Sequence, residues 1–271
     1  MFSFPLPFLG RPILWYGFFF ALGFFLGYWI LKFILKHYLA DFFKKEEIAS
    51  KSTYLAERMT FTAILGGVIG ARIGDLLFYQ PWVNYWNNPL AIISVWEGGL
   101  ASHGGAIGIV LAMGILAKRI RKTYPWVSWL AILDLAVLPT PFVGGFIRIG
   151  NFFNQEILGT PTDLPWAVLF LHPIDASAPI PRHPVQLYES LFYFLFFFIF
   201  LYLFWNHAFF RKKGKALGTF LLIVFLFRFF IEFVKTEQSY LLGAHFPLTM
   251  GQLLSIPCIL AGGWLLFRKS K

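Results

Sequence analysis

The sequence predicts an all-α polytopic membrane protein, and three observations support this fold class. Of the 271 residues, 58% are hydrophobic and only 13% are charged, a balance far from that of soluble domains. The apolar residues form seven runs, each long enough to cross a hydrocarbon core about 30 Å thick. Basic residues gather in alternate gaps between these runs. Backbone groups in lipid must be satisfied internally, so we expect seven transmembrane helices in a single membrane domain, residues 1–271.

The predicted spans follow one another along the chain. They cover residues 13–36, 59–79, 99–117, 126–147, 188–206, 217–235 and 249–267. Only Arg11 is basic before the first span and no small-residue cleavage motif follows it, so we expect a retained span rather than a signal peptide. Pro139 and Pro141 predict a kink in the fourth span and Pro257 a kink in the seventh. No internal repeat is visible, which disfavours transporter plans built from repeated halves.

The positions of the basic residues predict the orientation of the chain. A net charge of +10 would suggest a nucleic-acid partner in a soluble protein, but here it falls in alternate gaps, and we expect no such partner. The four basic clusters are Lys32 to Arg58, Lys118 to Lys122, Arg211 to Lys215, and Arg268 to Lys271. The positive-inside rule then places the N-terminus outside and the C-terminus in the cytoplasm. Of the two long outer connections, residues 80–98 suit an interfacial aromatic belt, and the proline-rich residues 155–187 predict a small extracytoplasmic (periplasmic) cap.

Polar residues gather toward the outer ends of the spans. A rise of about 1.5 Å per residue gives each of them a depth. The residues that converge near the outer leaflet are Tyr16, Arg72, Asp75, His103, Arg148, Asn151, Asn154, Glu156, Arg228 and Glu232. A charged side chain at mid-membrane costs roughly 2.5–3.5 kcal/mol, so such residues invite a functional interpretation. Two readings stay open for the pairs Arg228/Glu232 and Arg72/Asp75, which either neutralise each other or serve a bound ligand.

Single residues add detail to this picture. His103 lies in GGLASHGG, where glycines allow a helix or a lipid to approach its ring closely. Two roles stay open for it: a hydrogen-bond donor between helices, or a functional group. Arg148 is followed by amide side chains, and an arginine fork matches phosphate, which predicts an anion site for a phospholipid head. Asp134 reads as a structural hydrogen-bonding residue. Cys258 is the only cysteine, so an internal disulfide is impossible and a cysteine-based metal site is excluded. We expect its side chain to be inert and packed among apolar residues. We expect no metal and no cofactor.

Ordered motifs along nearly the whole chain resemble one known family. They are WYG (15–17), GARIGD (70–75), VWEGGLASHGG (95–105), GFIRIGNFFNQEILG (145–159), PRHPVQLYE (181–189), FRFFIEF (227–233) and MGQLLSIP (250–257). Together they resemble the prolipoprotein diacylglyceryl transferases of bacterial plasma membranes. The resemblance implies a multi-pass enzyme of the inner membrane whose active site faces the outer leaflet. It implies transfer of the diacylglyceryl group of phosphatidylglycerol to a prolipoprotein lipobox cysteine, with formation of a thioether and release of glycerol phosphate.

The resemblance, with the depth pattern, also assigns site residues. We expect His103, Arg148 and Arg228 to be catalytic, the histidine as base or orienting donor and the arginines as stabilisers of the leaving phosphate. The expected substrate-binding residues are Tyr16, Arg72, Asn151, Asn154, Glu156 and Glu232. His183 and Gln186 are expected to order the cap. Lys235 stands where the family usually has arginine, and Val224 with Phe225 replace a common tyrosine and glycine, so the resemblance assigns no headgroup contact to either place.

Two other functions remain as alternatives. A non-enzymatic transporter of a lipid or small anion would also need buried arginines, but it predicts polar groups around the midplane, whereas here they gather outward. A role as a structural assembly protein would not explain Arg148 and His103 near the outer leaflet.

Overall fold

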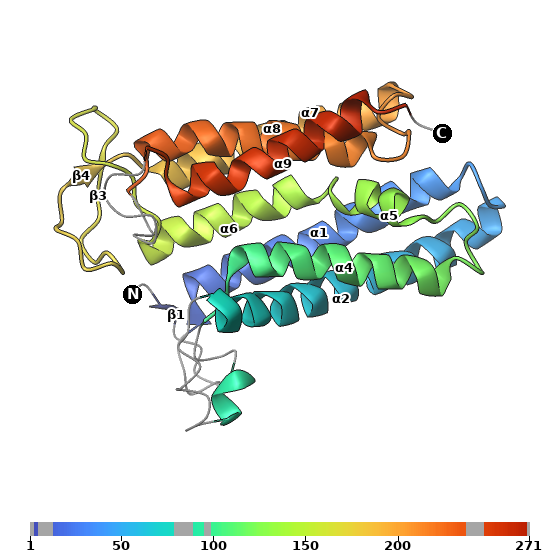
Figure 1. Cartoon of the computed structure of the whole chain (residues 1–271), viewed down its shortest axis with the longest axis horizontal. Coiled ribbons are helices and arrows are strands. Elements are labelled where there is room, and N and C mark those ends of the chain that lie inside the picture. The colour runs from blue at the N-terminus through green and yellow to red at the C-terminus, as the bar shows by residue number, and fades with distance from the viewer. Residues whose placement is uncertain (1–2, 5–12, 79–88, 95–98, 237–246, 270–271) are drawn as a thin grey trace. The chain divides into compact units, whose positions relative to one another are not determined.

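The computed structural model describes residues 3–4, 13–78, 89–94, 99–236 and 247–269, and within them the chain is mainly helical (Figure 1). The helices are α1 (Trp15–Leu39), α2 (Lys45–Phe78), α4 (Ser102–Ile120), α5 (Trp129–Ala136), α6 (Thr140–Asn154), α7 (Val185–Asn206), α8 (Lys215–Ile231) and α9 (Met250–Phe267). Short 3-10 turns cover Pro89–Ile92 (η1) and Glu232–Val234 (η3). Two antiparallel strand pairs join β1 (Ser3–Phe4) to β2 (Ile13–Leu14) and β3 (Val168–Leu169) to β4 (Pro181–Arg182).

The helices confirm the predicted fold class of a polytopic α-helical membrane protein. Within the described residues, six helical segments are long and apolar enough to cross a membrane, and the broken pair α5 and α6 gives a seventh if taken as one span. The orientation of the termini stays a prediction, as does the single membrane domain. Most of residues 80–98, including the predicted aromatic belt, lies outside the described residues.

Two helices extend much further than the apolar runs that predicted them. α2 begins at Lys45 rather than at residue 59, because charged residues outside lipid continue a helix as readily as apolar ones. α6 ends at Asn154 rather than at residue 147, so Arg148, Asn151 and Asn154 lie within a helix and not after its end. Hydrophobicity marks where the chain leaves lipid and not where the helix ends. α6 ends at Gln155, whose φ of 53° lies in the left-handed region that often terminates a helix.

The prolines of the fourth and seventh predicted spans have different effects. The helix is interrupted at residues 137–139, between α5 and α6. Pro141 lies in the first turn of α6, where its missing N–H removes no helical hydrogen bond. Pro257 lies inside α9, which continues through it.

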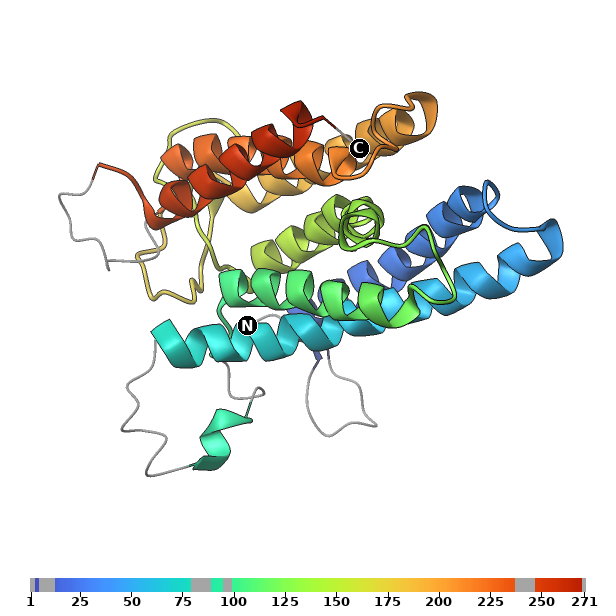
Figure 2. The ribbon, with the colours of Figure 1, turned by 45° about the vertical axis from the view of Figure 1, so that its right-hand side comes forward.

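The chain divides into two compact units, which are described separately. The α2–α4 unit comprises Leu31–Ala136, and the α6–α9 unit comprises Met1–Ile30 with Val137–Lys271. In the first, α2 and α4 lie side by side and antiparallel (Figures 1 and 2). Glycines face each other across this contact, so that a Cβ on Gly74 would lie 2.9 Å from the Cα of Gly104. Small residues allow two helix backbones to approach this closely, which is how membrane helices gain packing energy without a hydrophobic driving force.

The close contact of α2 and α4 predicts the effect of one added methyl group. We expect Gly70→Ala to destabilise the protein by about 1–3 kcal/mol, because the new Cβ would meet the backbone carbonyl of Gly104, which cannot rotate away. The melting temperature in detergent, followed by circular dichroism, measures this. The control is Gly67→Ala, whose Cβ would lie 3.4 Å from the flexible end of Ile109. Equal melting temperatures for the two variants would contradict the prediction.

In the α6–α9 unit, α7 lies antiparallel to α6, and α9 lies antiparallel to α8 (Figure 2). Phenylalanine rings fill the contacts: Phe142 of α6 lies 5.0 Å from Phe197 of α7, measured between ring centroids. Phe192 of α7 stacks on Phe227 of α8 at 3.7 Å. The first half of α1 packs on α6, where Trp15 stacks on Phe153. These contacts set the positions of the polar residues at one end of the unit.

One basic residue of the third predicted cytoplasmic cluster is structural. Lys215 is buried and its Nζ donates to the carbonyl oxygens of Leu265, Leu266 and Arg268, at 2.7–3.1 Å. These are the terminal carbonyls of α9, which have no partner within the helix. The ammonium group therefore caps α9 and ties it to the start of α8.

Candidate active site

The buried face of α7 changes from polar to aromatic along its length. Its buried residues recur at helical spacing: Val185, Gln186, Glu189, Ser190, Tyr193, Phe196, Phe197, Phe200 and Phe204. The polar members occupy the first turns and the phenylalanines the rest. A buried polar stripe requires partners on the neighbouring helices, so the first turns of α7 define where a polar site is built.

Glu189 is the centre of this polar site. Its side chain is 0% exposed, and its two oxygens face different cations. Oε2 lies 3.1 Å from Nε of Arg148 on α6, and Oε1 accepts a hydrogen bond from Nζ of Lys235, at 3.0 Å. Nζ of Lys235 also donates to Oε1 of Glu232, at 3.2 Å. Two cations and two anions thus balance each other in surroundings where an unpaired charge would be costly.

Arg148 is held on its other side by an amide chain. Its guanidinium donates to Oδ1 of Asn151 at 3.1 Å, and Nδ2 of Asn151 donates to Oε1 of Glu156 at 2.7 Å. The carbonyl oxygen of Glu156 accepts in turn from Gln186, at 2.8 Å. Arg148 also hydrogen-bonds the hydroxyl group of Tyr193. The guanidinium is therefore fixed in orientation, with only 13% of its side chain exposed.

Tyr16 joins the same group from α1. Its ring packs on α6 at Gly150, where a Cβ would lie 3.1 Å from Cδ2 of the tyrosine. The structure thus brings together Tyr16, Arg148, Asn151 and Glu156, four residues that the sequence placed at one depth.

Arg228 lies on α8 and is half-buried. The residue before it, Phe227, lies 6.3 Å from Tyr193 of α7, measured between ring centroids, so Arg228 directly follows a residue that contacts α7. Glu232, one turn further, pairs with Lys235 and accepts a hydrogen bond from Thr249, at 3.4 Å. Among the described residues, Arg228 has no acidic partner within 4 Å. Arg228 and Glu232 therefore do not form the ion pair that was one of the two alternatives. The positive charge of Arg228 is available to an anionic ligand.

The N-terminus of α9 supports Glu232. Thr249 and Gln252 form a capping box, and Gln252 also donates to the carbonyl oxygen of Phe229 on α8, at 3.3 Å. Gly251 contacts the carboxylate of Glu232 so closely that a Cβ there would lie 2.7 Å from Oε2. A helix N-terminus stabilises a negative charge. The start of α9 therefore adds to the stabilisation that Lys235 gives to the carboxylate of Glu232.

The predicted cap, residues 155–187, positions Lys235. Backbone hydrogen bonds join Thr160 to Val234 and Thr236 to Leu158, both at 3.0 Å, so that Gly159 and Lys235 pair as in a sheet. Buried Arg182 donates to the carbonyl oxygen of Gly159, at 3.2 Å. These bonds fix the backbone that carries the lysine. The cap is therefore part of the frame of the site.

His183 and Gln186 make contacts at this frame, and their role in ordering the cap stays a prediction. His183 lies 3.4 Å from the hydroxyl group of Tyr188, which also accepts from Trp166 at 2.7 Å. Gln186 is completely buried under the cap. Both contacts are consistent with ordering of the cap.

Arg72 and His103 belong to the α2–α4 unit. Arg72 lies 3.4 Å from Asp75 and donates to the carbonyl oxygens of Ile92 and Gly99, both at 3.0 Å. Gly99, with φ at 70°, allows the chain to turn around this guanidinium. These contacts favour the structural reading of the Arg72/Asp75 pair, in which Arg72 anchors the segment before α4. Its substrate contact stays a prediction.

His103 is the second residue of α4, and its ring lies 6.0 Å from that of Phe78 on α2. Its position relative to Arg148 and Arg228 stays a prediction, as does the substrate contact of Asn154, the last residue of α6. Asp134 is buried on α5, as a structural residue would be. Among the described residues, no group of three or more His, Cys, Asp or Glu side chains could hold a metal ion.

Sequence reasoning missed Glu189, Tyr193 and Lys235. Glu189 lies in the PRHPVQLYE motif, and its spacing of three from Gln186 and four from Tyr193 places all three on one helix face. That spacing was the available signal. Lys235 was noted only as a departure from the family, whereas it is a buried partner of two carboxylates.

Apolar helices and a buried ionic cluster between them define a multi-pass membrane protein with an internal polar site. Residues 6–268 match the family model described as prolipoprotein diacylglyceryl transferase. The chain therefore belongs to this family.

Three similar proteins carry the name phosphatidylglycerol–prolipoprotein diacylglyceryl transferase. The protein of Chloroherpeton thalassium is 43% identical over 260 residues, 96% of this chain and 89% of that protein. The protein of Porphyromonas gingivalis is 41% identical over 273 residues, 97% of this chain and 90% of that protein. The protein of Protochlamydia amoebophila is 46% identical over 222 residues, which cover 80% of this chain and 58% of that longer protein.

Proposed function

We propose that this protein is a transferase that moves the diacylglyceryl group of phosphatidylglycerol to the lipobox cysteine of a prolipoprotein, the first step of lipoprotein maturation. Family membership and the names of the relatives support the reaction. The observation that supports its location is Arg148 of α6, whose Nε lies 3.1 Å from Oε2 of the fully buried Glu189 on α7, together with a second arginine, Arg228, on the next helix, α8. Arg148 is neutralised and oriented, and Arg228 has no acidic partner among the described residues.

The reaction exchanges a carbon–oxygen bond for a carbon–sulfur bond. The cysteine thiol loses its proton to a base, and the sulfur attacks the glyceryl carbon that carries the phosphodiester. The carbon–oxygen bond breaks, and glycerol phosphate leaves with the electron pair. A thiol has a pKa of about 8.5, so a base near it increases the fraction of thiolate at neutral pH. His103 is our candidate for that base.

Negative charge develops on the leaving phosphate, and fixed cations near it lower the barrier. Arg228 is suited to this role because its charge is not already balanced by a neighbouring carboxylate. Arg148 is held by Glu189 and Asn151, so it can present the remaining N–H groups to the headgroup without losing orientation. Tyr16, Asn151, Glu156 and Glu232 then shape the headgroup pocket around the two guanidinium groups.

The proposed reaction also indicates which membrane holds the protein and which leaflet its active site faces. Prolipoproteins are modified after export begins, so the site faces the outer leaflet of the bacterial plasma membrane, in agreement with the positive-inside orientation. A non-enzymatic transporter is disfavoured, because the chain belongs to a family of transferases.

A reconstituted assay tests the proposal. Purified protein, phosphatidylglycerol and a lipobox peptide, with chelator and without nucleotide, are expected to give a peptide whose mass increases by one diacylglyceryl group, with glycerol phosphate released in equal amount. The control peptide has serine in place of the lipobox cysteine and should stay unmodified. Absence of product with the cysteine peptide, or modification of both peptides, would overturn the proposed reaction.

A further inference from the structure

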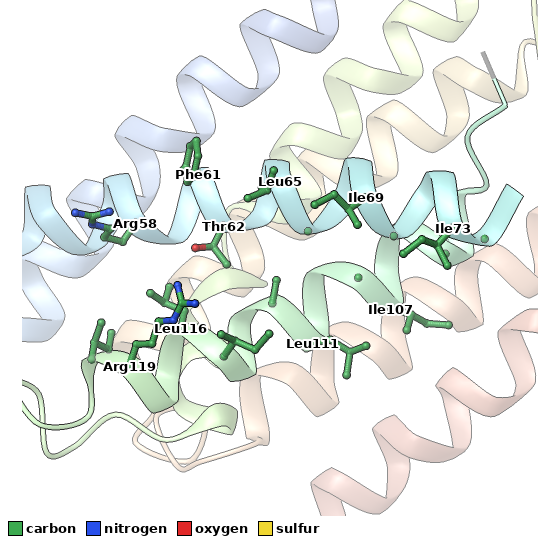
Figure 3. A pocket seen from close by; sticks show the side chains of 18 of the residues that line it. Arg58, Phe61, Thr62, Leu65, Ile69, Ile73, Ile107, Leu111, Leu116 and Arg119 are labelled. Atoms are coloured by element: carbon green, nitrogen blue, oxygen red, sulfur yellow. The ribbon is translucent and has the colours of Figure 1, made fainter. Parts of the chain in front are cut away.

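An apolar groove runs between α2 and α4, within the α2–α4 unit (Figure 3). Its volume is about 640 Å³, well within the range of about 300–1,000 Å³ that is usual for ligand sites. The closely packed glycines of the two helices form its floor, and exposed branched side chains such as Leu65, Ile69 and Leu111 form its walls. This surface suits an extended hydrocarbon chain.

One end of the groove is positively charged. Arg58 of α2 and Arg119 of α4 line that end, whereas Ile73 and Ile107 line the other (Figure 3). Both arginine side chains are exposed, and neither has an acidic partner within 4 Å among the described residues. The guanidinium of Arg58 lies 5.2 Å from the ring of Tyr54, which also lines the groove and holds the arginine at its mouth.

The groove is longer than one lipid leaflet is deep. Arg58 and Ile73 are 15 positions apart on one helix, or about 22 Å at the usual helical rise. One leaflet of the hydrocarbon core is about 15 Å deep, so an acyl chain that starts at the arginines fits within the groove. A neutral hydrocarbon ligand would not use the two cations, whereas an anionic headgroup would, because guanidinium groups bind phosphate through paired hydrogen bonds.

We propose that this groove binds an anionic phospholipid, with its phosphate on Arg58 and Arg119 and one acyl chain along the glycine floor. The positive-inside orientation places these arginines at the cytoplasmic leaflet, so this lipid is a resident partner of the fold and not the molecule that reacts. The site lies within a single unit and uses none of the residues assigned to the transfer reaction.

Native mass spectrometry of the full-length protein with added phosphatidylserine measures this binding. We expect the double variant Arg58→Gln/Arg119→Gln to bind phosphatidylserine roughly 25-fold more weakly than wild type at one site, because each arginine near an anionic headgroup contributes a factor of about five. Phosphatidylcholine with the same acyl chains carries the phosphate but no net charge, so it should bind wild type more weakly than phosphatidylserine does and should lose less affinity in the double variant.

Two further variants separate the groove from general charge. Lys118→Gln/Arg121→Gln removes two exposed basic residues at the same end of α4 that do not line the groove, and it should leave binding unchanged. Leu111→Trp keeps both arginines but fills the groove, and it should weaken binding like the arginine variant. Equal binding by wild type and Arg58→Gln/Arg119→Gln, or an equal loss in the Lys118/Arg121 control, would overturn the proposal.

Discussion

Glu189→Gln is expected to destabilise the protein by about 3–5 kcal/mol and to reduce transfer activity roughly 100-fold. Glutamine has nearly the same shape, so the change removes a charge without leaving a cavity. Arg148 would then lose its carboxylate partner, and Lys235 would keep only Glu232. Unbalanced charge in a buried site is costly, and an arginine without its anchor loses the orientation that the reaction needs.

The melting temperature and the initial rate of peptide modification measure the two effects. The matched control is Ser190→Ala, the next residue on the same helix, which loses one hydrogen bond to the carbonyl oxygen of Gly145 and should cost only about 1 kcal/mol. The double variant Glu189→Gln/Lys235→Met removes the unbalanced ammonium group as well. It restores the net charge of the cluster but leaves Glu232 without its lysine, so it should recover only part of the stability, and little of the activity, because Arg148 still lacks its anchor.

A fully stable Glu189→Gln protein would show that the carboxylate does not hold the cluster together. Recovery of both stability and activity in the double variant would show instead that Arg148 does not depend on Glu189 for its orientation.

The fold could be predicted largely from the sequence because lipid imposes simple rules on it. Apolar runs of sufficient length, with a helix required in each, gave the membrane spans without knowledge of tertiary contacts. Helix ends were less predictable, since a helix can continue beyond the lipid boundary, as α2 does at Lys45 and α6 does at Asn154. The position of Gln155 in the left-handed region is a local feature that hydropathy does not encode.

The site could be predicted only in part, because partner choice depends on three-dimensional contacts. Spacing on one helix left open whether Glu232 pairs with Arg228, four positions away, or serves a ligand. Instead it pairs with Lys235, which the cap strand at Gly159 holds in place. The spacing of Glu189 from Gln186 and Tyr193 marked a polar helix face, but it did not show that this face packs against Arg148 of α6. Depth along the membrane placed Tyr16, Arg148, Asn151 and Glu156 at one level, and the structure brings these four together, but depth did not distinguish which cations are neutralised.

Arg228→Gln is expected to reduce the turnover number about 100- to 1,000-fold, with little change in melting temperature. The reason lies in the difference between the two arginines: Arg148 is balanced by Glu189, whereas Arg228 has no acidic partner within 4 Å among the described residues. Loss of Arg228 therefore strands no buried anion, so the change should act on the reaction and not on the fold. Arg228→Lys keeps the charge but loses the planar fork, and we expect it to keep partial activity, about a tenth of wild type.

Separate measurement of kcat and KM for phosphatidylglycerol distinguishes the role of this arginine. A cation that acts on the developing phosphate charge lowers kcat when removed, whereas one that only binds the headgroup raises KM and leaves kcat unchanged. Arg211→Gln provides the control, since it removes the same charge from an exposed position in the loop between α7 and α8. Full turnover in Arg228→Gln would remove Arg228 from the reaction, and a change confined to KM would reduce its role to lipid binding, because only an interaction that strengthens in the transition state can accelerate the chemical step.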